Sequence, residues 1–159
     1  MSGDREARTD GFFHIGITVA DIDRSLVFYR DILGLEVTAD TTRHQDELSS
    51  LRTIIGVDPE TARIAFLRVP PTDDVFVELF QYTGVEQHPA SARPWDIAAS
   101  HCCFYVHDAE EVYRRLLDGD HRTRGPLTTV ASGPHAGAKA AYAIDPDGYV
   151  VEIYQRAPQ

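Results

Sequence analysis

The chain contains two copies of one residue pattern, and this internal duplication restricts its fold more than any other feature. His14 opens the stretch "HIGITVADIDRSLVFYRDILG", and His101 opens the similar stretch "HCCFYVHDAEEVYRRLLDG". In both, a strand-like run leads through an aspartate into a helical pattern that ends at a glycine. The copies also end alike, in "VFVELFQ" and "YVVEIYQ", so Glu78 corresponds to Glu152. A chain repeated in this way is expected to fold as two similar modules.

Hydrophobic periodicity predicts the same order of elements in each copy: a strand, a helix and three strands. The first copy should contain strand 12–19, helix 22–33 and strands 35–42, 62–69 and 74–82. The second should contain strand 99–106, helix 109–118 and strands 126–131, 138–144 and 149–155. The first copy is longer in its middle, where "RHQDELSSLRTIIGVDPE" predicts a short helix and a loop. We therefore expect an α+β fold of two tandem βαβββ modules.

These elements divide the chain into segments that together form one domain. We expect a flexible N-terminus over 1–11, a first βαβββ module over 12–84, a linker over 85–98 and a second βαβββ module over 99–156. A length of 159 residues is ordinary for one domain.

Charge and cysteine content exclude several classes of function. The formal net charge is −10 and no cluster of basic residues occurs, which argues against nucleic acid and anionic membranes as partners. The two cysteines are adjacent and would point to opposite faces of a strand, so a disulfide between them is not expected. No stretch has the pattern of a signal peptide or a membrane span. We expect a cytoplasmic protein.

Two histidines and two glutamates stand in the middle of strands at matching places in the copies. Side-chain alternation puts His14 and Glu78, and likewise His101 and Glu152, on the side of the sheet away from the helix. A lone histidine in a strand is usually structural, but here the pattern recurs. Two imidazoles and two carboxylates suit a divalent first-row metal. The duplication thus predicts a cupped mixed sheet around a metal site.

The same residues resemble a known family. "HIGITVADIDRSLVFYRDILGLEV" and "GPHAGAKAAYAIDPDGYVVEIYQ" are similar to the opening and closing signatures of the vicinal oxygen chelate superfamily. That superfamily includes glyoxalase I, methylmalonyl-CoA epimerase, extradiol dioxygenases and the bleomycin resistance proteins. The likeness extends from Phe12 to Gln155.

The resemblance implies roles for particular residues. By position, His14, Glu78, His101 and Glu152 match the family's metal ligands, and this set is similar to that of glyoxalase I. Glu152 or Glu78 would also act as the catalytic base. The metal could be Ni, Zn, Co, Mn or Fe, because the ligands alone do not separate them. Similar proteins usually form homodimers, and the cleft could lie within one chain or between two.

Other residues are expected around the site. Alternation places several side chains on its face or near its mouth, and these could equally belong to the core: Phe80, Tyr82, Cys103, Tyr105, His135 and Tyr154. His135 lies in a loop near the active-site mouth of similar proteins. We expect His44, His88 and His121 to lie in loops with their side chains exposed to solvent.

Three functions remain open at this point. The first is a metal-dependent lyase or isomerase of the glyoxalase I or epimerase type, which transfers a proton next to a metal-chelated carbonyl of a small molecule. The second is an Fe(II)-dependent, extradiol-type dioxygenase. The third is a resistance protein that sequesters a small antibiotic.

Overall fold

The first module has the element order that the sequence predicts. The computed structural model describes residues 9–90 and 92–158. Its first elements are β1 (His14–Thr18), α1 (Ile22–Leu26), the π-helix η1 (Val27–Ile32) and β2 (Glu36–His44). Then come the 3₁₀-helix η2 (Gln45–Glu47), α2 (Ser49–Ile55), β3 (Thr61–Arg68) and β4 (Phe76–Thr83). The predicted short helix of the longer first copy is therefore present as α2.

The second module repeats the order without the additional helices. It contains β5 (His101–Tyr105), α3 (Ala109–Asp118), β6 (Thr128–Thr129), β7 (Lys139–Ile144) and β8 (Val150–Gln155). Between the modules, described residues of the expected linker 85–98 form neither helix nor strand. Residues 1–8 of the expected N-terminal segment 1–11 lie outside the described residues.

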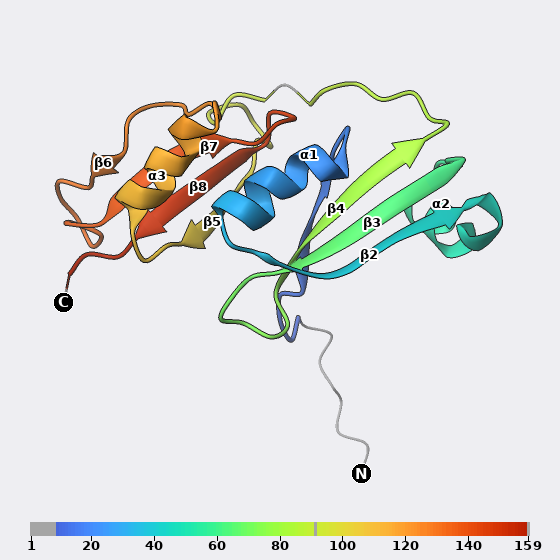
Figure 1. The fold of residues 1–159 in the computed structure, drawn as a ribbon, viewed down its shortest axis with the longest axis horizontal. Coiled ribbons are helices and arrows are strands. Elements are labelled where there is room, and N and C mark those ends of the chain that lie inside the picture. Colours follow the sequence, from blue (N-terminus) through green and yellow to red (C-terminus); the bar gives the residue numbers. More distant parts are fainter. Residues whose placement is uncertain (1–8, 91, 159) are drawn as a thin grey trace, which may run out of the picture.

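Each module forms its own four-stranded mixed sheet (Figure 1). The strand orders are β1-β4-β3-β2 and β5-β8-β7-β6. The pairs β1–β4 and β5–β8 are parallel, and the remaining pairs are antiparallel. The expected curved sheet thus consists of two sheets, and in each the strand that carries the histidine is an edge strand.

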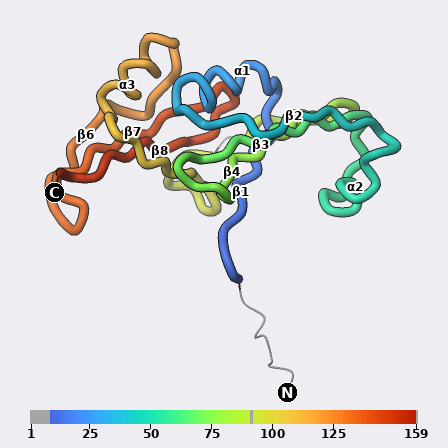
Figure 2. Tube along the Cα trace, turned by 60° about the horizontal axis from the view of Figure 1, so that its bottom comes forward, coloured from blue at the N-terminus to red at the C-terminus, as the bar shows by residue number. Residues whose placement is uncertain are grey.

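Helices α1 and α3 cover the same side of the two sheets (Figure 2). One hydrophobic core runs through both modules, and it includes Ile17, Phe28, Leu79, Phe104, Leu116 and Ile153. Burial of this apolar surface is the main force that holds the modules together. Polar contacts add to it, because Tyr29 Oη donates to Asp145 Oδ2 at 2.9 Å.

Helices α1 and α3 begin with the same two kinds of contact. The aspartate that precedes each helical pattern in the sequence caps the helix: the Asp21 carboxylate accepts from the Arg24 amide, and the Asp108 carboxylate accepts from the Glu111 amide. A glutamine of the last strand in each module adds a second acceptor. Gln81 Oε1 accepts from the Ile22 amide at 2.9 Å, and Gln155 Oε1 accepts from the Ala109 amide at 2.8 Å.

Two expectations need correction. The predicted helix 22–33 is α-helical only to Leu26 and continues as η1, where the Leu33 amide bonds to the Phe28 carbonyl at 3.1 Å. His121 is not fully solvated: it is half-buried, its ring centroid lies 5.2 Å from that of Phe28, and burial lowers its pKa. No helix among the described residues is long and apolar enough to cross a membrane.

Candidate metal centre and active site

The structure brings the four predicted ligands together as two pairs. His14 Nε2 lies 3.0 Å from Glu78 Oε2, and His101 Nε2 lies 3.3 Å from Glu152 Oε2. Sheet register produces both contacts, because each histidine stands on an edge strand and each glutamate on the parallel strand beside it. The duplication of the sequence is therefore a duplication of the site's geometry.

The two pairs do not meet within one chain. Over residues 9–90 and 92–158, no three His, Cys, Asp or Glu side chains are grouped so that they could hold a metal ion. Each pair instead lies at one edge of its sheet, formed by β1 in the first module and by β5 in the second. One chain thus presents two half-sites of the same composition.

The half-sites differ in burial. The Glu78 side chain is 10% exposed and that of Glu152 is 20% exposed. Burial raises the pKa of the Glu78 carboxyl, and the neighbouring His14 opposes this shift. His14 Nδ1 is itself buried without a hydrogen-bond partner in the described chain. A buried carboxylate facing an imidazole is an arrangement that a bound cation would stabilise.

An aromatic ring flanks each pair at an equivalent place, which the sequence analysis missed. Phe66 on β3 lies opposite Glu78, and its ring centroid is 6.3 Å from that of His14. Tyr142 on β7 lies opposite Glu152, and its hydroxyl is 3.4 Å from His101 Nε2. The available signal was the aromatic residue at the same position of "IAFLR" and "AAYAI".

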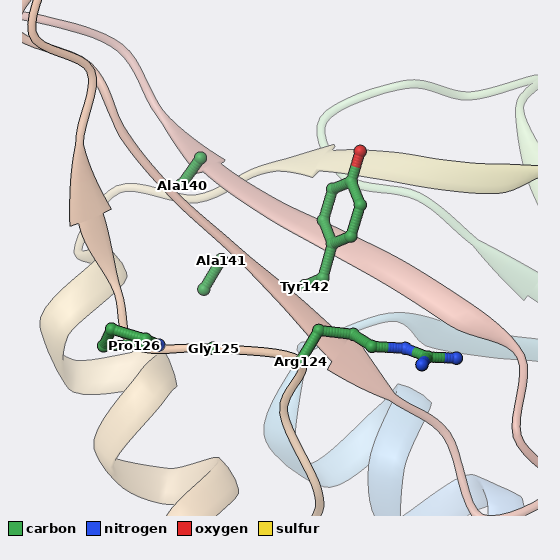
Figure 3. Close-up of a pocket in the computed structure, with 6 residues that line it drawn as sticks. All are labelled: Arg124, Gly125, Pro126, Ala140, Ala141 and Tyr142. Carbon is green, nitrogen blue, oxygen red and sulfur yellow. The ribbon is translucent and has the colours of Figure 1, made fainter. Parts of the chain in front are cut away.

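A shallow pocket lies beside Tyr142 (Figure 3). It has a volume of about 340 Å³ and is lined by Arg124, Gly125, Pro126, Ala140, Ala141 and Tyr142. Arg124 and Tyr142 stand at one end of it, and Pro126 and Ala140 at the other. This open surface adjoins the second half-site through the contact between Tyr142 and His101.

The other predicted pocket residues form two groups, one in each module. In the first module, Phe80 stacks on Tyr82 with a centroid distance of 5.7 Å. In the second, Cys103 lies opposite Glu152, and burial is the main cause that raises its pKa to about 12. The remaining members are Tyr105, His135 and Tyr154, which contact one another in a row.

Known proteins share this sequence and fold. A 2-epi-5-epi-valiolone epimerase from an Actinomyces species is 32% identical over 144 residues, which cover 88% of this chain and 76% of that protein. A lactoylglutathione lyase from Salmonella typhimurium is 27% identical over 89% of this chain and 90% of its own length. The crystal structure of a glyoxalase family protein from Bacillus cereus has the same fold, with a TM-score of 0.76, 17% identity and 99% of each chain covered.

The relatives indicate both the kind of protein and its family. Because they are named as an epimerase and a lyase, the chain is a glyoxalase-like enzyme of the lyase or isomerase kind. Residues 11–153 match the Glyoxalase/Bleomycin resistance protein/Dioxygenase superfamily, and the chain belongs to that superfamily.

Proposed function

We propose that the protein is a metal-dependent lyase or isomerase that transfers a proton at the carbon next to a carbonyl group of a small-molecule substrate. The observation that carries this proposal is the pair of matching His–Glu contacts, at 3.0 and 3.3 Å. The relatives favour proton transfer over oxygen chemistry, since those above are named for epimerisation and for a lyase reaction.

The residues of the half-sites fit a divalent metal. Imidazole nitrogens and carboxylate oxygens are the donors that Ni, Zn, Co, Mn and Fe accept. His14 and Glu78 would hold it from one side, and His101 and Glu152 from the other. The metal, when bound, supplies a Lewis acid that polarises the substrate carbonyl.

The chain's own carboxylates do the proton transfer in this proposal. Glu78 or Glu152 takes the proton from the carbon beside the carbonyl with a side-chain oxygen and returns it to the substrate. The rings of Phe66 and Tyr142 pack beside the His14 and His101 rings, with centroids 6.3 and 4.9 Å away.

We further propose that a homodimer completes the site. Each half-site stands at a strand that has a sheet neighbour on one side only among the described residues, and such edges are commonly covered in native proteins. If β1 of one copy lies beside β5 of a second copy, two imidazoles and two carboxylates face one another. Two-fold symmetry would then produce two equivalent sites for each dimer.

The proposed function is tested by proton exchange with the solvent. Substrates named by the relatives, 2-epi-5-epi-valiolone and S-lactoylglutathione, are incubated in deuterated water with the parent protein, Glu78→Gln and Glu152→Gln. Because glutamine keeps an oxygen ligand but not basicity, we expect deuterium incorporation to fall about 10²–10⁴-fold in the variant that loses the base.

Glu110→Gln serves as the control, since Glu110 forms a surface ion pair with Lys139. It should exchange deuterium as the parent does. Parental rates in both Gln variants would make the glutamates ligands only. Oxygen consumption by the parent without any exchange would replace this proposal with the dioxygenase alternative.

A further inference from the structure

Arg156 directly follows β8, the strand that carries Glu152 of the second half-site. Most described arginines form ion pairs, as expected in a chain of net charge −10. Arg156 forms none within the described chain. Its guanidinium carbon instead lies 3.9 Å from the centroid of the Tyr105 ring. The aromatic face holds the cation in place without neutralising its charge.

Tyr154 and His135 extend the row of contacting side chains that begins with Arg156 and Tyr105. The rings of Tyr105 and Tyr154 meet edge to face, with centroids 5.7 Å apart. The Tyr154 hydroxyl lies 2.9 Å from His135 Nδ1. Tyr105 and His135 are both exposed to solvent, so the row of side chains is open to a ligand.

This row lies on the same face as the proposed metal ligands. Tyr154 follows Glu152 by two residues on β8, so the two side chains point to the same side about 6.6 Å apart along the strand. Tyr105 and Cys103 on β5 are related in the same way, and Cys103 lies opposite Glu152. A molecule bound at Glu152 could therefore extend along β8 toward Arg156.

We propose that Arg156, His135 and Tyr154 form a subsite for an oxyanion of the substrate, either a carboxylate or a phosphate. The guanidinium offers a planar set of donors that matches either group. The hydrogen-bonded pair of Tyr154 and His135, reached from Arg156 through the Tyr105 ring, offers a further donor. This assignment rests on the proposed function for the other end of the substrate and adds that the substrate is an anion.

Arg93 provides a matched control. It also stacks on an aromatic ring, with its guanidinium carbon 5.5 Å from the Trp95 centroid. However, Arg93 donates to the carboxylate of Asp96 and lies in the linker. Removal of Arg93 therefore removes a stacked arginine whose charge is already compensated.

The experiment is a calorimetric titration of the full-length protein with inorganic phosphate and, separately, with succinate. We expect the parent to bind at least one of them, and Arg156→Gln to bind it at least about tenfold more weakly, because a charge-assisted hydrogen bond is lost. His135→Gln should weaken binding less. Arg156→Lys should recover part of the loss, and Arg93→Gln should bind like the parent.

The anion that binds the parent more tightly, phosphate or succinate, identifies the substrate group for the subsite as a phosphate or a carboxylate. A parent that binds neither anion overturns the proposal, as does an Arg156→Gln variant that binds like Arg93→Gln. Metal content measured on the same samples should be equal in all variants. Binding needs no turnover, so a failure here is distinguishable from a failure of the proton-transfer proposal.

Discussion

At the scale of single residues, Asp145 connects the two modules. It is 1% exposed and accepts hydrogen bonds from Tyr29 Oη and from the amides of Asp147 and Tyr149. Burial raises the pKa of this carboxyl, while its hydrogen bonds act in the opposite direction. A buried carboxylate tolerates the loss of a donor poorly.

Tyr29→Phe should therefore destabilise the protein by about 1–3 kcal/mol, the cost of leaving a buried acceptor without its partner. The measurement is urea unfolding followed by circular dichroism. Tyr113→Phe is the control, because the Tyr113 hydroxyl makes only long contacts, at 3.5 Å to Thr123 and 3.4 Å to Gly125. Equal stability of Tyr29→Phe and the parent would contradict the role given to this bond.

His101→Ala tests the ligand assignment directly. It should lose most of the metal that the purified parent retains, because an imidazole donor disappears from the proposed set. Elemental analysis measures the metal content. His44→Ala is the control, since His44 ends β2 on the exposed side of the first module. Stoichiometric metal in His101→Ala would remove this residue from the site.

The sequence predicted which residues share a face of each sheet, but not what surrounds them. The recurrence of His and Glu at matching strand positions was sufficient for this, because strand alternation determines the face on which each side chain lies. Tyr142 and Arg156 were missed because their roles depend on sheet register and on the packing of Tyr105. Neither register nor side-chain stacking can be read from periodicity alone.

At the scale of elements, η1 has a π-helical geometry that the hydrophobic periodicity of the sequence did not predict. The apolar positions of 22–33 fit an α-helix, yet the wider turn of a π-helix follows Leu26. In this geometry both Phe28 and Tyr29 are fully buried although they are neighbours in sequence. The bounds of the predicted strands lie within about two residues of those of β1 to β8, although only two residues of the predicted strand 126–131 remain in β6.

An ion pair between β2 and β3 gives a pH-dependent prediction. Arg63 donates to both carboxylate oxygens of Asp40, at 2.9 and 2.7 Å, and this contact lowers the pKa of Asp40. A lowered pKa in the folded state stabilises the protein above the unfolded value near 3.8, and the benefit is lost as the pH falls through the folded value. Asp40→Asn should thus cost about 1 kcal/mol at neutral pH and almost nothing in strong acid.

Urea unfolding of the parent and Asp40→Asn at a series of pH values from neutral downward measures this difference. Asp74→Asn is the control, because Asp74 forms no ion pair within the described chain. Its effect should be small at every pH. A constant difference between the parent and Asp40→Asn down to the lowest pH would show that the charge of Asp40 is not the cause.

At the scale of the whole molecule, each half-site lies on the edge strand of its own sheet and the strand beside it. The two modules contact each other through η1 and α3, and β1 and β5 are edge strands in the strand order of their sheets. We therefore expect light scattering to give about twice the monomer mass of 17.7 kDa. A monomeric mass at micromolar concentration would contradict the shared site.

Mixing two inactive variants tests the shared site more sharply. His14→Ala and His101→Ala should each lack function alone. In a mixed dimer, one site carries both changes and the other carries neither, so co-expression should restore about a quarter of the sites. Metal content and deuterium exchange measure the recovery. No recovery in a sample proven to contain mixed dimers would place all four ligands in one chain.

If the site is divided between two chains, catalytic activity also depends on the protein concentration, because only the dimer contains a complete site. If neither edge can hold a metal with two ligands, a lone chain is inert however well it is folded. Specific activity would then decline on dilution, following the dissociation constant of the dimer rather than the stability of the fold. The cellular abundance of the protein would set how much of it works, without any regulator acting on it.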